Sequence, residues 1–389
     1  MALAVSGGGD SMALAWLASR WRRNLLALIV DHGLRPESAE EARLTARRLG
    51  ELNIPSRILT LSGLLPGPGI AARARRARYE ALFRACREAG ATSLLLGHQA
   101  DDQAETVVIR QETHSGPDGL AAMAVVSWGA DVRLVRPLLG ESRAGLRDLL
   151  RAAGVSWEDD PSNENRAAAR VRIRQDICGT DRRDGLLRLA REAGAVRQDH
   201  AAGLAEELAC IATFYAEGWV RLERLPSPPA MAALIRTLGG HVYPPPREAV
   251  DRLLASAGPA SAGRGATLAG LCLRCFPAGL FLFREVAAMA GACPARNGAL
   301  WDGRFVLRTQ TPCPPGLEIR AAGTGLARRE RCGLPALLCA TLPALWSGAC
   351  RVAVPHLDLR TDEALRDVRF VFRPAIPATG TALWDLSER

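Results

Sequence analysis

The stretch AVSGGGDSMAL (residues 4–14) sets three glycines between two serines, after a strand-like run and before a helical pattern. Glycine lets the main chain adopt positive φ and lie close to a ligand, so that consecutive N–H groups point into one cavity. The following helix adds free N–H groups and the positive end of its dipole, which favour anions. The stretch therefore predicts a phosphate-binding loop, and the alternative is an ordinary tight turn between a strand and a helix.

Residues 1–160 alternate between strand-like and helical patterns. The strand-like runs lie at 2–5, 25–30, 57–61, 93–96 and 132–135, and the helical patterns at 11–21, 37–53, 70–89 and 101–110. Strands that alternate with amphipathic helices form a parallel sheet covered on both faces, so this part predicts an α/β fold with a doubly wound, Rossmann-like sheet. Ligands of such sheets bind at the carboxyl ends of the strands, where the glycine loop lies.

The pattern changes after about residue 180. Helical periodicity dominates 186–255, a strand-like run covers 266–285, and proline-rich stretches mark turns or linkers. We expect a catalytic domain at 1–180, a mainly helical domain at 181–292 and a small α+β domain at 293–389.

Composition narrows the chemistry. All 50 basic residues are arginine, so neither lysine Schiff-base chemistry nor a lysine-dependent P-loop is available. The net charge of +9 is compatible with a polyanionic partner. No apolar run is long enough for a membrane helix, and no signal peptide is visible, so we expect a cytoplasmic protein whose ten cysteines are free thiols.

Several motifs resemble one known family. SGGGDS (6–11) is similar to the PP-loop of the N-type ATP pyrophosphatases, and VDHGLR (30–35), GHQADDQAET (97–106), RPLL (136–139) and WEDDPSNENRAAARVRIR (157–174) follow in order. Together they resemble the tRNA(Ile)-lysidine synthetase family over nearly the whole chain. The resemblance implies that ATP adenylates carbon 2 of the wobble cytidine of an isoleucine tRNA with a CAU anticodon and releases pyrophosphate. Free L-lysine then displaces AMP to form lysidine.

The resemblance also implies which residues contact ATP. These follow the first, second and fourth predicted strands: Ser6, Gly7, Gly8, Gly9, Asp10, Ser11, Asp31, His32, Gly97 and His98. For Asp31 the alternative is a cap on the next helix.

Two carboxylates mark the next helix. Asp102 and Glu105 are three residues apart and face the same way, so they can hold Mg²⁺ or a substrate ammonium group. We expect Asp10, Asp102 and Glu105 to be catalytic, and Asp10 and Asp101 to bind Mg²⁺. The alternative is a solvated acidic first turn that complements the helix dipole.

Arginines that match family positions are expected to contact tRNA phosphates: Arg75, Arg78, Arg166, Arg170, Arg172 and Arg174. The alternative is a set of solvent-exposed or ion-paired side chains. The two C-terminal domains are expected to bind tRNA as well, and the sequence leaves the oligomeric state open, including a homodimer.

The chain departs from the family pattern at several positions. Gln99 replaces a second histidine, Glu112 and His114 stand where small or basic residues are expected, and Val171 replaces an asparagine. Met1 directly precedes the first strand, where members carry a short segment; this indicates either an earlier start or a shortened strand.

Two other functions remain open. One is a PP-loop amidotransferase or thiolase that acts on a small molecule or on another tRNA position. Enzymes that thiolate tRNA use paired cysteines, whereas the one C-x-x-C pair here, Cys272 and Cys275, lies in an apolar strand pattern outside the catalytic part. We expect both cysteines to be buried in the core. A non-catalytic RNA chaperone with a degenerate site is disfavoured because the loop serines and the carboxylates are retained.

Overall fold

The computed structural model describes residues 1–389 except 34–36, 65–66, 68, 130–131, 159–172, 174–180, 242, 258–264 and 380–389. The chain forms two compact units, one built on Met1–Ala201 and the other on Ala202–Gly380. Each unit is described by itself.

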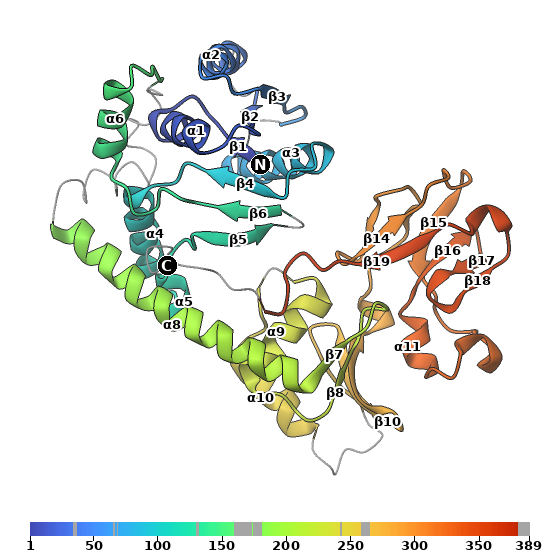
Figure 1. Ribbon diagram of the computed structural model, residues 1–389. Helices are drawn as coiled ribbons and strands as arrows, with labels where there is room; N and C mark the ends of the chain where they lie inside the picture. The colour runs from blue at the N-terminus through green and yellow to red at the C-terminus, as the bar shows by residue number, and fades with distance from the viewer. Residues whose placement is uncertain are drawn as a thin grey trace. The chain divides into compact units, whose positions relative to one another are not determined.

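The first unit contains a six-stranded sheet in the order β3-β2-β1-β4-β6-β5 (Figure 1). Its strands are β1 Ala2–Ala4, β2 Leu26–Asp31, β3 Ser56–Thr60, β4 Ser93–Leu96, β5 Val126–Gly129 and β6 Val132–Val135. All neighbours pair in parallel except β5, which runs antiparallel to β6. The order reverses direction at β1 and β4, so the ends of these two strands flank the point where such sheets bind ligands.

Helices cover both faces of this sheet. They are α1 Gly9–Trp21, α2 Ser38–Glu51, α3 Ile70–Glu88, α4 Ala100–Glu112, α5 Pro117–Leu120 and α6 Arg143–Ala152. One apolar cluster joins α1, α2 and α6 to the sheet through residues such as Met12, Leu49 and Leu150. A second cluster joins α3 to the opposite face through Leu82 and Cys86, which lie with Leu94 and Leu134. The predicted doubly wound fold is confirmed.

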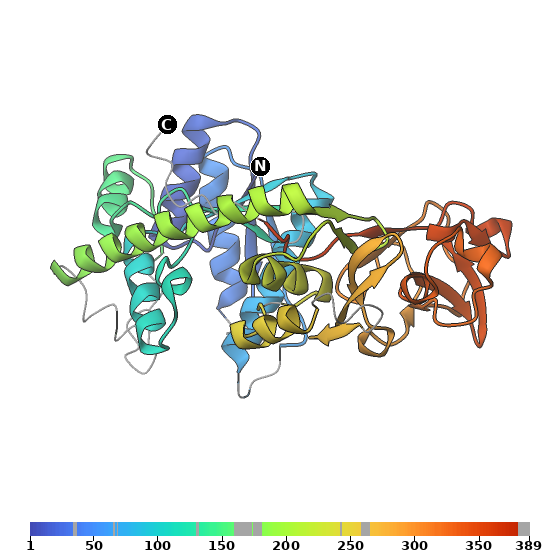
Figure 2. The same cartoon turned by 90° about the horizontal axis from the view of Figure 1, so that it is seen from below.

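The second unit carries three antiparallel sheets. Its helices are α9 Pro228–Gly239, α10 Arg247–Ser256 and the short α11 Ala336–Ala340, with 3₁₀ turns at Val286–Ala288, Arg328–Arg331, Pro355–Leu357 and Glu363–Leu365; the long α8 Asp181–Ile211 begins in the first unit. The first sheet has the order β7-β8-β11-β10-β9, formed by Ala212–Phe214, Val220–Leu222, Gly279–Arg284, Leu271–Phe276 and Ala266–Leu268. Figures 1 and 2 both show α9 and α10 side by side, and their apolar residues pack with those of this sheet.

The other two sheets lie in the C-terminal part. One has the order β12-β15-β16-β17-β18, formed by Cys293–Pro294, Leu317–Ala321, Pro343–Ser347, Cys350–Val354 and Leu359–Arg360. The other has the order β13-β14-β19, formed by Leu300–Trp301, Phe305–Arg308 and Arg369–Phe372. The boundaries predicted at residues 180 and 292 remain a prediction.

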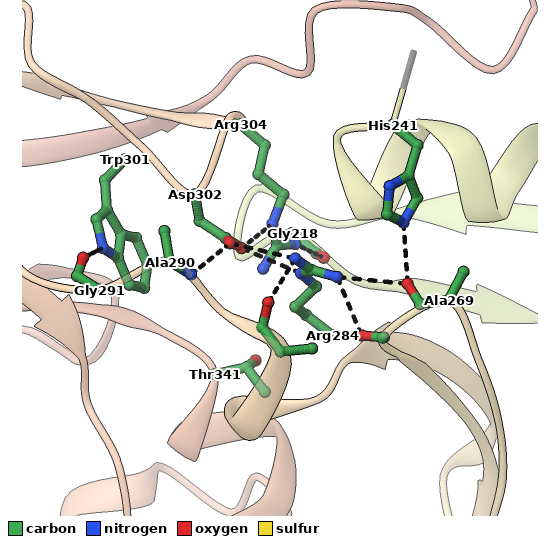
Figure 3. Close-up of polar contacts among 12 residues, drawn as sticks. Gly218, His241, Ala269, Arg284, Ala290, Gly291, Trp301, Asp302, Arg304 and Thr341 are labelled. Carbon is green, nitrogen blue, oxygen red and sulfur yellow. Dashed lines mark hydrogen bonds and ion pairs between the residues drawn. The ribbon is translucent and has the colours of Figure 1, made fainter. Parts of the chain in front are cut away.

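A buried charge cluster, the Asp302 cluster, braces this unit (Figure 3). Arg304 Nε donates to Asp302 Oδ2 at 2.7 Å, and Arg284 Nε donates to the same oxygen at 3.3 Å. The remaining donors reach backbone carbonyls: Arg304 Nη1 bonds Gly218 O at 3.1 Å, and Arg284 Nη2 bonds Ala288 O at 2.7 Å. The cluster therefore ties β11, the β13–β14 turn and the β7–β8 turn together, with one carboxylate shared by two guanidinium groups.

The prediction that Cys272 and Cys275 are buried is wrong. Cys272 is only partly buried and Cys275 is exposed. They lie on β10, where side chains alternate between faces, so positions three apart point to opposite sides. Cys272 packs against the cluster that contains Trp219 and Phe281, and Cys275 shares the face of Leu271 and Leu273 but lies near the hairpin end of the strand, where it is exposed. In the described part of the chain, no helix has the length and apolar character needed to cross a membrane.

Candidate active site

The glycine loop has the backbone shape that its sequence predicts. Gly7 has φ +89°, and a Cβ at this position would collide with Thr45 Oγ1 of α2, so only glycine fits. Gly8 is the N-cap of α1 and has no capping side chain. The first N–H groups of α1 are therefore not taken by a capping side chain, which leaves them for an anion.

The two loop serines have different surroundings. Ser11 is buried; its Oγ donates to Gly8 O at 2.9 Å and accepts from Ser6 N at 3.2 Å. Ser6 is exposed, with its Oγ 3.3 Å from Ser11 Oγ. Ser11 thus fixes the curve of the loop, whereas Ser6 presents a hydroxyl at its surface.

Residues after α6 support the loop from outside. Glu158 N donates to Gly7 O at 3.0 Å, and a Cβ at Gly9 would lie 3.4 Å from the Trp157 ring. Arg48 Nη1 donates to Glu158 Oε2 at 2.8 Å, which ties this support to α2. We did not predict this role from the sequence, although the WEDD motif named both residues.

Asp10 and Asp31 face different partners. Asp10 lies in the first turn of α1. Its Oδ2 atom is 3.5 Å from Arg143 Nη2, and its side chain is partly exposed. Asp31 is buried; its Oδ1 accepts from Gly33 N at 3.0 Å and from Ser38 Oγ at 2.6 Å. The Asp31 carboxylate thus binds Gly33 and the first residue of α2, but it does not cap that helix, whose N-cap is Glu37. Its neighbour His32 is partly buried at the same edge of the sheet.

Gly97 brings the end of β4 against the glycine loop. A Cβ at Gly97 would lie 3.0 Å from both Asp10 O and Ser11 Cα, so any other residue would push the two segments apart. This close approach is how Gly97 serves the site. It also places His98 directly beside the loop.

Gln99 begins α4 with a reciprocal cap. Its side chain accepts from Asp101 N at 2.7 Å, while Asp102 Oδ2 accepts from Gln99 N at 3.0 Å. Gln99 is fully buried. A residue that departs from the family pattern therefore takes a defined structural role, which the sequence alone did not indicate.

The three carboxylates of α4 differ in exposure and partners. Asp101 is paired with Arg183 at 3.6 Å. Asp102 is partly buried and uses one oxygen in the cap, and Glu105 is 3% exposed. Asp102 and Glu105 share a helix face as predicted. In the described residues, no three histidine, cysteine or acidic side chains gather as a ready-made metal site.

His98 lies among charged groups. Burial lowers its pKa to about 4; the Asp102 carboxylate opposes this effect, and the positive charges of Arg136, Arg75 and Arg78 add to it. The structure thus brings two of the predicted tRNA-contacting arginines close to His98. It also adds Arg136, which sequence reasoning missed although it opens the RPLL motif. Arg166, Arg170, Arg172 and Arg174 lie outside the described residues.

Comparisons with known proteins agree on one family. A family model described as the PP-loop domain, with the name ATP_bind_3, matches residues 1–180. A tRNA(Ile)-lysidine synthase from Ruegeria pomeroyi is 37% identical over 92% of this chain and 89% of its own. Another, from Mesorhizobium japonicum, is 35% identical over 84% of this chain and 76% of its own. Among solved structures, the U34-tRNA thiolase NcsA from Methanococcus maripaludis has a TM-score of 0.42 at 17% identity, covering 49% of this chain and 70% of that chain.

Three observations point to one family: the glycine loop, the capped carboxylate helix beside it, and the similarity over 92% of this chain. The chain belongs to the tRNA(Ile)-lysidine synthase family.

Proposed function

We propose that this protein joins L-lysine to carbon 2 of the wobble cytidine of an isoleucine tRNA with a CAU anticodon, in the cytoplasm. Two facts support this: membership in the tRNA(Ile)-lysidine synthase family, and the arrangement of the glycine loop and the α4 carboxylates at one edge of the sheet. The observation that carries most weight is the contact of Gly97 with the backbone of Asp10 and Ser11, because it joins the ATP side of the site to the α4 side.

In the first step, the oxygen on carbon 2 of the cytidine attacks the α-phosphorus of ATP. A phosphorus–oxygen bond forms, the bond to the β-phosphate breaks, and pyrophosphate leaves. The open N–H groups of α1 and the Ser6 hydroxyl would stabilise the charge that builds on the phosphate oxygens. The rigid packing of the loop by Thr45 and Trp157 would keep these donors in place during the reaction.

Asp10 fits a Mg²⁺ ligand better than the other acidic residues do. Its carboxylate is partly exposed in the first turn of α1, directly beside the loop, whereas Asp101 lies on α4 and Asp102 caps that helix. Mg²⁺ commonly uses one or two carboxylates together with phosphate oxygens, so a single protein carboxylate is sufficient. When bound, the ion would neutralise charge on the ATP phosphates.

In the second step, the ε-amine of lysine attacks carbon 2, a carbon–nitrogen bond forms, and AMP leaves with the oxygen. The chain has no lysine of its own, so this amine comes from solution. The amine must be neutral to attack, and a carboxylate beside it can orient it and accept its proton. Asp102 and Glu105 share the α4 face for that role.

The direct test incubates the protein with ATP, ¹⁴C-lysine and a transcript of isoleucine tRNA with a CAU anticodon. We expect label in the tRNA and release of one pyrophosphate per lysine incorporated. A transcript with a GAU anticodon is the control for the wobble base. Absence of label, with the fold intact and ATP bound, would reject the proposal.

Variants of the glycine loop test whether the loop acts in the adenylation step, as distinct from folding. Ser6→Ala or Asp10→Ala should stop pyrophosphate release without unfolding the protein, because both side chains act on charge near the α-phosphate. If either variant keeps near-normal turnover, the loop does not act on ATP as proposed.

A further inference from the structure

Three side chains from three different elements bind the backbone of residues 122–124, a stretch between α5 and β5 that we name the anchored segment. They are Arg197 of α8, Gln103 of α4 and Arg136, which follows β6. The segment belongs to no helix or strand, and Ala122 has a φ of +50°, a region that residues other than glycine rarely adopt. Its conformation therefore depends on the side chains that bind it.

Gln103 joins the anchored segment to α4. Its Oε1 accepts from Met123 N at 2.9 Å, and its Nε2 donates to Met123 O at 2.8 Å. The side chain is buried, so both bonds are shielded from water. Gln103 directly follows Asp102 and lies two residues before Glu105. A shift of the anchored segment is therefore passed to the helix turn that carries both carboxylates.

Arg197 binds the same segment from α8. Its Nη1 donates to Ala122 O and to Asp118 O, both at 3.3 Å. Its Nε and Nη2 are inaccessible to solvent and have no hydrogen-bond partner among the residues that the structure describes. Burial lowers the pKa of Arg197, and the Asp118 carboxylate opposes this effect. Burying a guanidinium group in this way costs free energy that an apolar side chain would not, so packing alone does not explain an arginine here.

α8 also packs directly on the carboxylate helix. Leu186 and Ala190 of α8 lie in one apolar cluster with Ala104 and Val107 of α4. Beyond this cluster, α8 continues as one helix to Ile211, past the last residue of the first unit. The position of α8 is thus passed to α4 by two routes, the apolar cluster and the anchored segment.

We propose that Arg197 is a positioning residue for the α4 carboxylates. Through the anchored segment and Gln103, it fixes where Asp102 and Glu105 stand, and it contacts no substrate itself. The inference rests on the proposed function, which gives these two carboxylates their part in lysine transfer. Because α8 extends beyond the first unit, the same contact links the position of that helix to the rate at the site.

The first part of the test needs no substrate. Hydrogen–deuterium exchange of the full chain follows the Met123 amide, which Gln103 protects. We expect this amide to exchange about ten-fold faster in Arg197→Met, since each anchoring bond contributes to the local stability of the segment. Arg191→Met is the matched control, because Arg191 is exposed on the same helix and does not bind the segment. Exchange equal to that of the control would overturn the proposal.

The second part measures single-turnover lysine transfer to adenylated tRNA at saturating lysine. The variants are Arg197→Met, Gln103→Met and the double variant, each checked for folding by urea denaturation. We expect each single variant to lose about ten-fold in rate, since a small displacement of catalytic groups is costly. The double variant should lose no more than the larger single loss, because both residues act through one segment. Arg197→Lys keeps a donor for the same carbonyls and should recover most of the rate.

The outcomes separate the two proposals. A wild-type protein that transfers no lysine rejects the proposed function, whereas a fully active Arg197→Met variant rejects only the positioning role. Losses that multiply in the double variant would show that Arg197 does not act through Gln103, which also overturns the inference. Should Arg197→Met fail to fold, Arg197→Gln gives the same comparison, because it removes the charge and keeps a polar side chain.

Discussion

The Asp302 cluster and the His98 cluster, which is formed by His98, Arg136, Arg75 and Arg78, hold their arginine side chains in different ways. In the first, two arginines share one aspartate, and their other donors reach backbone carbonyls. In the second, Arg136 donates to a carbonyl and a hydroxyl group, and Arg75 lies over the Tyr79 ring. A buried carboxylate shared by two arginines makes a brace, whereas Arg136 and Arg75 are oriented by neutral groups.

Exposure follows the same division. Arg304 is 1% exposed and Asp302 is 8% exposed, so no ligand can reach that centre. Arg75 and Arg78 are exposed and Arg136 is partly buried, which leaves the His98 cluster accessible from one side. The net charge of a cluster does not distinguish a buried cluster from an accessible one. The positions of the groups that contact its arginines do.

The largest expected effect is the loss of stability when the Asp302 cluster loses its carboxylate. Asp302→Asn keeps the shape of the side chain and tolerates the positive φ of 51° at this position, yet it leaves two buried guanidinium groups without a counter-charge. We expect the unfolding free energy of the second unit to fall by roughly 3 to 5 kcal/mol. Urea denaturation of the full chain, followed through the transition of that unit, measures it.

Asp358→Asn is the matched control for this change. Asp358 also has positive φ, at 56°, and pairs with Arg360, but its side chain is 93% exposed. Exposed pairs contribute less than about 1 kcal/mol. Equal effects of the two substitutions would contradict the distinction between a buried brace and a surface pair.

The next effect concerns the close approach between the end of β4 and the glycine loop. Gly97→Ala would set a methyl group 3.0 Å from backbone atoms of Asp10 and Ser11, and neither can move without shifting the loop. A displacement of about 1 Å at such a site costs roughly 100-fold in rate, so we expect a loss of that size in pyrophosphate release. Gly50→Ala, on α2 with open space around it, is the control. Normal release by the Gly97 variant would show that the loop tolerates a wider gap.

Much of this architecture could be predicted from sequence. Regular alternation and the run at residues 4–14 gave the five parallel strands, the helices between them and the loop. The antiparallel strand β5 was missed, because the expected order required a helix before each strand and β5 instead forms a hairpin with β6. The cap by Gln99 was missed because it depends on backbone geometry at the end of β4, and not on residue type alone.

The partners of Arg136 could not be predicted either. Its contacts with Ala124 and Ser127 come from the same unexpected hairpin, and its proximity to His98 depends on strand order. The burial of Cys275 was mispredicted because the sequence did not indicate that this residue lies near the hairpin between β10 and β11, where it is exposed.

A smaller effect tests whether the α4 carboxylates act in lysine transfer and not in adenylation by ATP. Glu105→Gln keeps the size of this buried side chain and removes its charge. We expect the rate of lysine transfer to pre-adenylated tRNA to fall about ten-fold, less than the roughly 100-fold or more that a general base contributes, because Asp102 remains on the same helix face; adenylation should change less. Single-turnover assays of the two steps provide the measurement. An equal or larger loss in adenylation would place Glu105 with Mg²⁺ and ATP.

The smallest effect is on the protonation of His98. Removing the neighbouring positive charge in Arg136→Gln should raise its pKa from about 4, and removing the negative charge in Asp102→Asn should lower it. NMR titration of the imidazole checks both signs. Shifts in the same direction in the two variants would show that burial alone controls this group.

The depressed pKa of His98 also affects stability. The folded value lies below the unfolded value of 6.5, so the unfolded chain takes up a proton first as the pH falls. His98 therefore costs stability progressively between pH 6.5 and about 4, and has no such effect at higher pH. His98→Gln should remove this part of the acid destabilisation.

The most direct test of the contrast follows the Nε–H resonances of Arg136 and Arg304 by NMR, assigned with Arg→Gln variants at each position. An anticodon stem-loop RNA with the CAU sequence and, separately, pyrophosphate are added to the full chain. The account predicts that the Arg136 resonance shifts with one of these ligands and becomes protected from exchange with water, while that of Arg304 stays unchanged. If Arg136 remains unchanged with both ligands at saturation, or if the two resonances move together, the two clusters do not differ in the way proposed.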